Sequence, residues 1–298
     1  MNILHIWDQS GVACILAKYQ KKIGHNAIVL RRSNYDPYGI YEYYKELVEF
    51  VDEKEYLSMC LRKAKNVDIV HIHSRADALL YLKKYLEKEV KFIMHFHGSD
   101  LRGINRNFTR EKIILIPKLL FKNYNARRIR ERNNLLAQKY ADKIILSTPD
   151  LQDKIKKSMP IVLDNPVDTE HFCKSVPAAN NSAGDNKFTF STEATSNTKW
   201  IINYCRNNGI DNLQIIDRTK FPIRYSEMPD FLKRFNTYVD IRYVNNNVLN
   251  NLSKTALEAL ACGLKVIDHK LKYWSDLPTV HEPSKVAKKA MQIYEEIS

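Results

Sequence analysis

The stretch VDIVHIHSRADALLYLKKYLEKEVKFIMHFHG, residues 67–98, decides the fold class of this chain. Two short apolar runs, 67–73 and 90–98, flank a segment whose apolar residues recur with helical spacing. Near-continuous apolar runs are typical of strands covered on both faces, and a helix between two such runs returns the chain to begin a parallel strand. The stretch therefore predicts a β-α-β unit of a parallel sheet.

The same alternation continues through most of the chain. Further strands are expected at 2–7, 25–32, 142–147, 160–166, 187–192, 212–217, 238–244 and 264–268. A long helix is expected over 41–65 and a C-terminal helix over 284–297, and the composition of 174–187 predicts a linker. We therefore expect the α/β class, with two doubly wound parallel-sheet domains at 1–166 and 167–298.

The bulk composition is that of a globular protein, with 298 residues of which 44% are hydrophobic and 27% charged. No apolar run reaches the 18 or so residues that a membrane span needs. The five cysteines are scattered and form no Cys-x-x-Cys motif, so we expect reduced thiols rather than disulfides or a zinc site. The N-terminus lacks the features of a secretory signal, and a cytoplasmic location is expected.

Positive charge is concentrated in residues 101–140. This segment holds eleven Lys and Arg against two Glu, which is +9 of the net charge of +13. Such a segment favours an anionic partner or an anionic surface.

The segment SKTALEALACGLKVID, residues 253–268, predicts a nucleotide site. Ser253 and Thr255 stand where an N-cap would precede an apolar helix, and Gly263 stands where that helix would end. The N-terminus of a helix attracts phosphate, and Glu258 lies one turn further along. Its carboxylate could accept two hydrogen bonds from a ribose diol; the alternative is an acid that only supports the helix start.

Two His-x-His pairs, His71/His73 and His95/His97, end two predicted strands. Residues i and i+2 of a strand face the same way, so four imidazoles could converge on a metal ion. No carboxylate or cysteine stands at ligand spacing beside them. Buried histidines that hydrogen-bond to the backbone are the favoured interpretation, and no metal site is predicted.

The segment SKTALEALACGLKVI resembles the signature segment of the retaining family-4 glycosyltransferases, which have the GT-B fold of two facing Rossmann-like domains. Further segments resemble the same family in the same order: 1–30, DIVHIHS at 68–74, HFHGSDL at 95–101, ADKIILSTPDLQDKI at 141–155 and LDNPVDTEHF at 163–172. The resemblance covers nearly the whole chain. It implies transfer of a sugar from a nucleotide diphosphate sugar to a hydroxyl acceptor with retention of configuration.

The resemblance also implies roles for single residues. Glu258 would hold the donor ribose, His97 would lie near the transferred sugar, Lys199 would contact the donor phosphates, and Gly11 would allow their close approach. Enzymes of this fold type need no bound metal, the chain has no Asp-x-Asp pair, and no cofactor is expected.

Two departures from the family pattern bear on activity. The first Glu of the pattern falls on Asn250, an amide that can bind sugar hydroxyls but cannot balance positive charge. The arginine that usually precedes the phosphate lysine falls on Ala194, and Arg224 or Arg242 could replace it. A catalytically inactive relative that binds a nucleotide sugar or a glycan is therefore the alternative. A Rossmann dehydrogenase is disfavoured because no Gly-x-Gly-x-x-Gly follows a strand.

The basic segment mixes apolar clusters with Arg127, Arg128, Arg130 and Arg132. That composition is typical of a helix on an anionic membrane surface, so a peripheral position at the inner face of the membrane and a lipid-linked or glycan acceptor are expected. A solvated helix face is one alternative. Nucleic-acid binding is the other, but no nucleic-acid motif is present, and no nucleic-acid partner is predicted.

Overall fold

The structure is a computed structural model that describes residues 1–33, 36–102, 117–174, 186–191, 198–218, 220–244 and 247–298. The chain forms two compact units. The first comprises Met1–Tyr35, Tyr44–Asp164 and Val286–Ser298, and the second comprises Asp36–Tyr43 and Asn165–Lys285.

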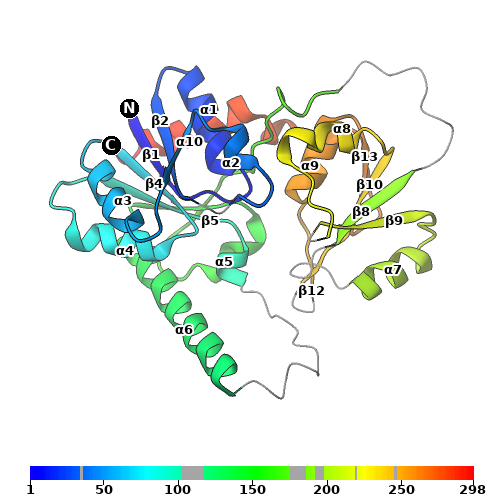
Figure 1. Cartoon of the computed structure of the whole chain (residues 1–298), viewed down its shortest axis with the longest axis horizontal. Coiled ribbons are helices and arrows are strands. Elements are labelled where there is room, and N and C mark those ends of the chain that lie inside the picture. Colours follow the sequence, from blue (N-terminus) through cyan, green and yellow to red (C-terminus); the bar gives the residue numbers. More distant parts are fainter. Residues whose placement is uncertain (34–35, 103–116, 175–185, 192–197, 219, 245–246) are drawn as a thin grey trace. The chain divides into compact units, whose positions relative to one another are not determined.

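The first unit is built on a seven-stranded parallel sheet (Figure 1). Its strands are β1 Asn2–Ile6, β2 Asn26–Arg32, β3 Val48–Val51, β4 Ile69–His73, β5 Lys91–Phe96, β6 Lys143–Leu146 and β7 Ile161–Val162. Its helices are α1 Val12–Lys22, α3 Tyr56–Ala64, α4 Ala76–Tyr85, α5 Ser99–Arg102, α6 Pro117–Tyr140 and the 3-10 helix Pro149–Lys154. The strand order β3-β2-β1-β4-β5-β6-β7 reverses direction between β1 and β4. In such sheets ligands bind beyond the carboxyl ends of the strands at this reversal.

The two faces of the first sheet differ in chemistry. One face carries residues such as Leu4, Ile72 and Met94, which pack in an apolar core with α3, α4 and Ala137 of α6. The opposite face is covered by α1 and by the C-terminal helix α10, Pro283–Glu295 (Figure 1). Successive residues of a strand point to opposite faces of the sheet. Every second strand residue therefore belongs to the apolar core, and the residues between them face α1 and α10.

The second unit has a five-stranded sheet in the order β14-β13-β10-β8-β9. Its strands are β8 Lys187–Ser191, β9 Leu213–Asp217, β10 Thr237–Asp240, β13 Lys265–Asp268 and β14 Tyr273–Trp274, and β11 Tyr243–Val244 pairs with β12 Asn247–Val248 in a separate hairpin. Its helices are α2 Ile40–Tyr43, α7 Thr198–Asn207, α8 Met228–Leu232, α9 Lys254–Ala261 and the 3-10 helices Tyr225–Glu227 and Thr279–His281. Within the five-stranded sheet all pairs are parallel except β13 with β14, and the order reverses between β8 and β10.

The α/β class and the alternation of strands and helices agree with the sequence-based prediction. The single long helix predicted over 41–65 was wrong, because β3 interrupts it and pairs with β2 at the edge of the sheet. Val48, Phe50 and Val51 favour a strand, and pairing with β2 outweighs the helical preference of the flanking residues.

The unit boundaries also differ from a simple division near residue 166. Residues 36–43 belong to the second unit, and 286–298, the greater part of α10, belong to the first. A search for contiguous domains could not have found either exchange. Most of the predicted linker 174–187 lies outside the described residues, and none of the described helices is long and apolar enough to cross a membrane.

Candidate functional site

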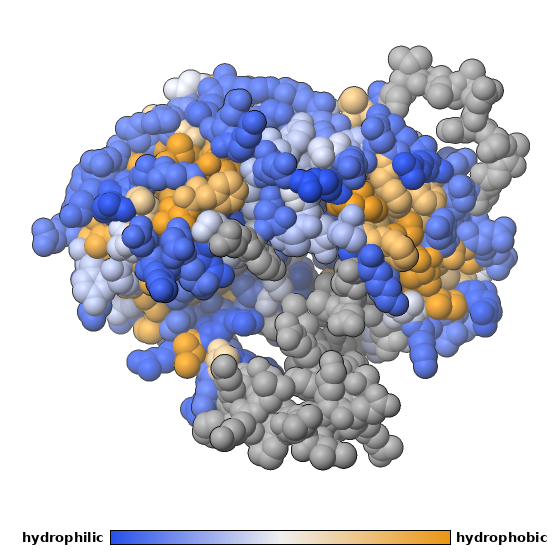
Figure 2. All heavy atoms as spheres, viewed as in Figure 1, coloured by the Kyte–Doolittle hydropathy of each residue, from blue (hydrophilic) through white to orange (hydrophobic). Residues whose placement is uncertain are grey.

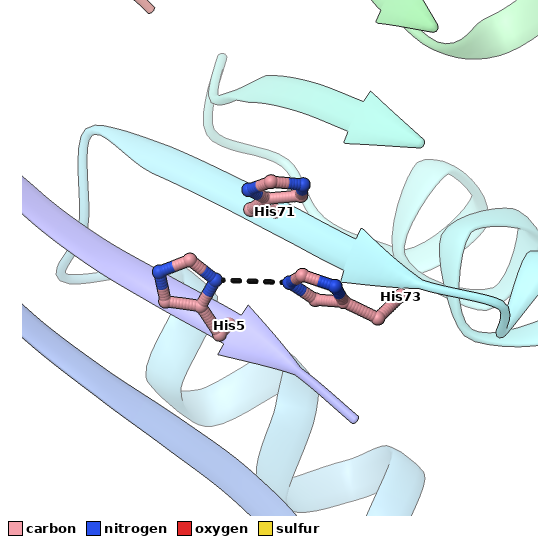
Figure 3. Close-up of side chains that lie close together, drawn as sticks. All are labelled: His5, His71 and His73. Atoms are coloured by element: carbon pink, nitrogen blue, oxygen red, sulfur yellow. Dashed lines mark hydrogen bonds between the residues drawn. The ribbon is translucent and has the colours of Figure 1, made fainter. Parts of the chain in front are cut away.

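Five histidines gather on the α1 and α10 side of the first sheet, near the carboxyl ends of three adjacent strands. His5 lies on β1, His71 and His73 on β4, His95 on β5, and His97 directly after β5. The strand register places His5 beside His71 and His73 beside His95. Figure 3 shows how His5 reaches across from β1 to His73 on β4, with His71 next to them. Four of these side chains are at most 1% exposed.

The five imidazoles and three other polar side chains form a closed ring of hydrogen bonds. The order around the ring is Gln20, His5, His73, His97, Ser147, His95, His71, Tyr294 and again Gln20. The eight links measure 2.6–3.2 Å between heavy atoms. Gln20 comes from α1, Ser147 follows β6 and Tyr294 comes from α10, so the ring joins four strands to both helices that cover them.

Burial keeps the histidines of the ring neutral. It lowers the pKa of His5 to about 4, and it lowers the pKa values of the three fully buried histidines on β4 and β5 well below the ordinary range. Burial also lowers the pKa of His97, although the nearby carboxylates of Asp100 and Asp8 favour its charged form. The prediction of buried histidines is confirmed, but their partners are side chains rather than backbone groups.

Two groups of three histidines are close enough together to bind one metal ion. They are His5, His71 and His73, and His73, His95 and His97. The potential ligand atoms of each trio lie within 4.8 Å of one another. Neither trio includes a carboxylate or thiolate that would offset the charge of a buried ion. Both nitrogens of every imidazole are already used in the ring, so we describe the cluster as a hydrogen-bonded ring and assign no metal to it.

The turn after β1 is organised by Asp8, which is 1% exposed. Its carboxylate accepts hydrogen bonds from the backbone N–H groups of Gly11, at 2.7 Å, and of Ala13. Gly11 has a φ of 80°, a region that favours glycine. These two N–H groups at the start of α1 therefore contact a carboxylate of the protein, and the donor-phosphate role predicted for Gly11 stays a prediction.

The turn after β5 is organised in the same way by Asp100. Its carboxylate accepts hydrogen bonds of 2.7–3.0 Å from the Ser74 hydroxyl and from the backbone N–H groups of His97, Gly98 and Leu101. His97 is thus held through both its backbone and its ring, at the strand end where ligands bind in sheets of this kind.

The second unit carries the predicted nucleotide segment at the carboxyl edge of its own sheet. Ser253 is the N-cap of α9, as predicted, and its hydroxyl accepts the Ala256 N–H at 3.0 Å. Glu258 is 6% exposed, and burial raises the pKa of its carboxyl group. The nearby charges of Lys254, whose Nζ lies 3.7 Å from the carboxylate, and of Arg218 oppose that rise.

Two further groups frame this carboxylate. Arg218 directly follows β9, and its guanidinium lies over the ring of Tyr38, 4.3 Å from the ring centre. Tyr38 belongs to the 36–43 segment, which therefore contributes to the second unit's site. Asp240 at the end of β10 accepts the Ser253 N–H at 2.7 Å and pairs with Arg242 at 3.3 Å.

The remaining predicted donor residues lie around this edge. Thr255 is partly exposed in the first turn of α9, Lys199 is exposed in the first turn of α7, and Asn250 is exposed between β12 and α9. Ala194 lies outside the described residues.

Two arginines were suggested as replacements for the one missing at 194, and each has an acidic partner. Arg224 pairs with Glu42, and Arg242 pairs with Asp240. Arg218 and Lys254 are instead the basic groups that act on Glu258.

The predicted basic surface lies on α6 (Figure 2). Residues 126–132 of this helix are exposed, including Arg127, Arg128, Arg130 and Arg132, and Ile129 among them is 60% exposed. Arg127 pairs with Glu131 at 2.8 Å. Figure 2 shows this part of α6 as mainly hydrophilic with a few hydrophobic residues. The apolar cluster 113–116 lies outside the described residues.

The sequence-based predictions missed four of the eight ring residues and both cations that act on Glu258. His5 stands in a strand-like run and could have been found as a third strand carrying an inward-facing histidine. Gln20 and Tyr294 carry no local signal, because one is an ordinary helix residue and the other lies 274 positions away. Arg218 carries none either, since its role depends on where β9 ends.

Replacement of Tyr294 by Phe should open the ring. Both Nδ1 of His71 and the amide N–H of Gln20 would lose their partner in a buried position, which costs about 1–3 kcal/mol for each group. Urea unfolding should show this loss, while Tyr140→Phe, at a 42% exposed tyrosine of the same unit, should change stability little. Equal stability of both variants with the wild type would contradict the closed ring.

Acidification should destabilise the protein through the same histidines. Their folded pKa values lie below the unfolded value of about 6.5, so below that pH the unfolded state binds protons that the folded state does not. The free energy of unfolding should fall from pH 6.5 toward 4, by up to about 1.4 kcal/mol per pH unit for each histidine. Urea midpoints at pH 7.5, 6.5 and 5.5 measure this; a flat profile would show that these imidazoles bind protons equally well in the folded and the unfolded state, which contradicts the prediction.

No model of a protein family matches this chain, and no curated protein sequence matches it. Solved structures do. An alpha-glucosyltransferase in complex with UDP and a 13-mer DNA containing an HMU base matches 100% of this chain and 89% of its own, with a TM-score of 0.56 and 12% identity. A second alpha-glucosyltransferase structure, in complex with UDP and a 13-mer DNA containing a central A:G mismatch, matches with a TM-score of 0.55 and 14% identity. The match covers 91% of this chain and 80% of that one.

A sucrose-phosphate synthase from Thermosynechococcus elongatus matches with a TM-score of 0.50 and 11% identity, over 90% of this chain and 81% of its own. Likenesses at such identities bear on the fold alone. The two Rossmann-like sheets and these matches over almost the whole chain confirm the predicted GT-B fold.

Proposed function

We propose that this protein is a glycosyltransferase that uses a nucleotide diphosphate sugar as donor. The observation that carries the proposal is the buried carboxylate of Glu258 beside Lys254 and Arg218, at the N-terminus of α9 and the carboxyl edge of the second sheet. Solved structures of the same fold include alpha-glucosyltransferases that hold UDP, which supports the same ligand class here.

Each part of this site suits one part of the donor. The Glu258 carboxylate can accept two hydrogen bonds from the vicinal hydroxyls of a ribose. Lys254 and Arg218 can balance the negative charge that develops on a leaving diphosphate, an effect that is large where water is excluded. The partly exposed N-terminus of α9 adds backbone N–H groups and a positive dipole end.

We further propose retention of configuration and no requirement for a bound metal, because the resemblance to the retaining family-4 enzymes implies both. Under this proposal His97 lies near the transferred sugar and Lys199 contacts the diphosphate from the exposed start of α7. Asn250 stands where the family has a carboxylate. The second candidate function is therefore that of a catalytically inactive relative that binds a nucleotide sugar or glycan.

For the acceptor, we propose a hydroxyl compound presented at the α6 surface, with a lipid-linked glycan as the favoured form. The exposed arginines beside the exposed Ile129 fit an anionic membrane surface, which would place the protein peripherally at the inner face of the membrane. The alpha-glucosyltransferase structures hold DNA, so the acceptor experiment includes DNA as a second anion.

The test of the donor proposal is a binding screen against nucleoside diphosphates and nucleotide sugars, followed by turnover. A ligand at one hundred times its Kd stabilises the protein by about 2.7 kcal/mol, a shift of a few degrees in Tm. Release of nucleoside diphosphate from a bound nucleotide sugar, dependent on an added acceptor, would support the enzyme. Binding without any turnover would support the inactive relative, and no binding at all would refute both.

Replacement of Glu258 by Gln should weaken binding of the nucleotide by about 1.5–3 kcal/mol, because a hydrogen bond to a charged group is lost. Isothermal titration with the ligand found in the screen measures the change. Glu227→Gln removes an exposed carboxylate of the same unit and is the matched control. Unchanged affinity in the Glu258 variant would remove this residue from the site.

Replacement of Arg127, Arg128, Arg130 and Arg132 together by Gln should release the protein from anionic lipid vesicles. Cosedimentation at low and high salt measures the loss, and neutral vesicles give the background. Lys83, Lys84, Lys88 and Lys91 changed to Gln provide a charge-matched control elsewhere on the same unit. If the wild-type protein does not bind vesicles but binds a DNA duplex in a salt-dependent manner, the membrane proposal is wrong and a nucleic-acid acceptor is favoured.

A further inference from the structure

The hydrogen bonds of the buried histidine ring all run in the same donor-to-acceptor sense, and Gln20 determines that sense. A neutral imidazole has one N–H donor and one acceptor nitrogen, and a hydroxyl has a single proton to donate. In a closed ring of such groups, each member that accepts on one side must donate on the other. All members therefore donate in the same sense around the ring.

The amide of Gln20 sets that sense because its two ends differ. Its N–H group donates to the Tyr294 hydroxyl, which leaves the hydroxyl proton for Nδ1 of His71. Its oxygen lies 2.8 Å from Nε2 of His5 and accepts the proton there.

The links between these two ends follow without conflict. Each imidazole accepts at Nδ1 and donates from Nε2, and the Ser147 hydroxyl accepts from His95 and donates to His97. All five histidines are then neutral Nε2–H tautomers. A rotated amide would reverse every link and make all five Nδ1–H, so the five cannot change tautomer independently.

We propose that Gln20 is a positioning residue that, through this ring, holds His97 in one neutral tautomer with both ring nitrogens turned into the protein. His97 lies three links from Gln20 on the β1 side of the ring, through His5 and His73. Gln20 is fully buried on α1, and its side chain hydrogen-bonds to His5 and Tyr294, so its effect on His97 is transmitted through the ring.

If the proposed function is right, the ring fixes the charge that His97 presents to the transferred sugar. His97 offers its ring edge to a sugar but no acidic or basic nitrogen, and its backbone N–H is held by Asp100. The charged groups that face it are Asp8 and Asp100, which favour a proton on it, and the ring withholds that proton. A neutral imidazole adds no positive charge beside a sugar that becomes positively charged as its bond to the diphosphate breaks.

The inference is tested without substrate by long-range ¹H–¹⁵N spectra of the histidines in the full-length wild-type protein. Five of the nine histidines should show the same tautomer and should not titrate between pH 6 and 8.5. Mixed tautomers or an imidazolium signal among these five would overturn the proposal. So would metal retained at one equivalent after purification, because a bound ion would take the nitrogens that the ring uses.

Two variants then isolate Gln20. Gln20→Leu removes the element that sets direction, so the five histidines should become a mixture of both tautomers. Gln20→Glu places an acceptor at both ends, so the ring closes only if it binds one extra proton, on the carboxylate or on one histidine. Its folding equilibrium constant should then fall about tenfold more per pH unit than that of the wild type above pH 6.5, since the folded state holds a proton that the unfolded state does not.

Gln152→Glu adds a carboxylate at an exposed position of the same unit and should show no extra pH dependence. A purely structural Gln20 would lose stability in both of its variants but would show neither the tautomer mixture nor the added slope, and that result would refute the proposal. These readouts need no nucleotide sugar, so the ring can be confirmed even where the glycosyltransferase proposal fails.

Discussion

Imidazoles buried away from water must satisfy two nitrogens each, and this requirement shapes the first unit. A row of imidazoles that hydrogen-bond to one another always leaves an unmatched donor at one end and an unmatched acceptor at the other. Ser147 bridges the far side of the row, and Tyr294 and Gln20 join the two remaining ends. The eight polar side chains thereby lie among buried apolar residues such as Ile69 and Ile93 between the sheet and the helices α1 and α10, and the neutrality of the ring avoids the large cost of a buried charge.

The second unit treats its buried polar group in the opposite way. Glu258 is an acidic group that lies beside two cations. Burial raises the pKa of its carboxyl group, and the two cations counteract part of that rise. Under the proposed function, the desolvated carboxylate and its two cations would exchange some of these contacts for a ligand's hydroxyls and phosphates, whereas the imidazole nitrogens of the ring are all hydrogen-bonded to one another or to ring side chains. Neutral imidazoles thus line one sheet edge, and a buried carboxylate with two cations lies at the other, as the proposed donor site requires.

The sequence predicted what depends on short-range pattern. The strands around 67–98, the cap at Ser253 and the helix end before Gly263 all follow from residues within one turn or one strand. The paired histidines could be placed on one face of the sheet, since a two-residue period requires it. Prediction failed where a distant partner decides the outcome. The strand β3 exists because β2 offers it an edge, and no local pattern outweighed the helical residues around it.

The candidate site shows the same limit more sharply. His97 could be named from its strand end, but its partners could not, because they come from α1, β6 and α10. Lys199 could be aligned with a family position, yet the charges that act on Glu258 come from Arg218 and Lys254. Which cation reaches a buried carboxylate depends on where a strand ends and how a helix turns toward it, and neither is encoded within a few residues.

The ring also imposes an order on how the chain is completed. Tyr294 lies in the 286–298 segment that joins the first unit, and residues 165–285 of the second unit precede it in the chain. While the protein is synthesised, His71 and Gln20 therefore lack their shared partner until residues 165–285 have been made. Domains usually fold in order from the N-terminus. Here residues 1–164 cannot satisfy the buried polar groups of the first unit alone, and the unit becomes complete only when α10 has been made.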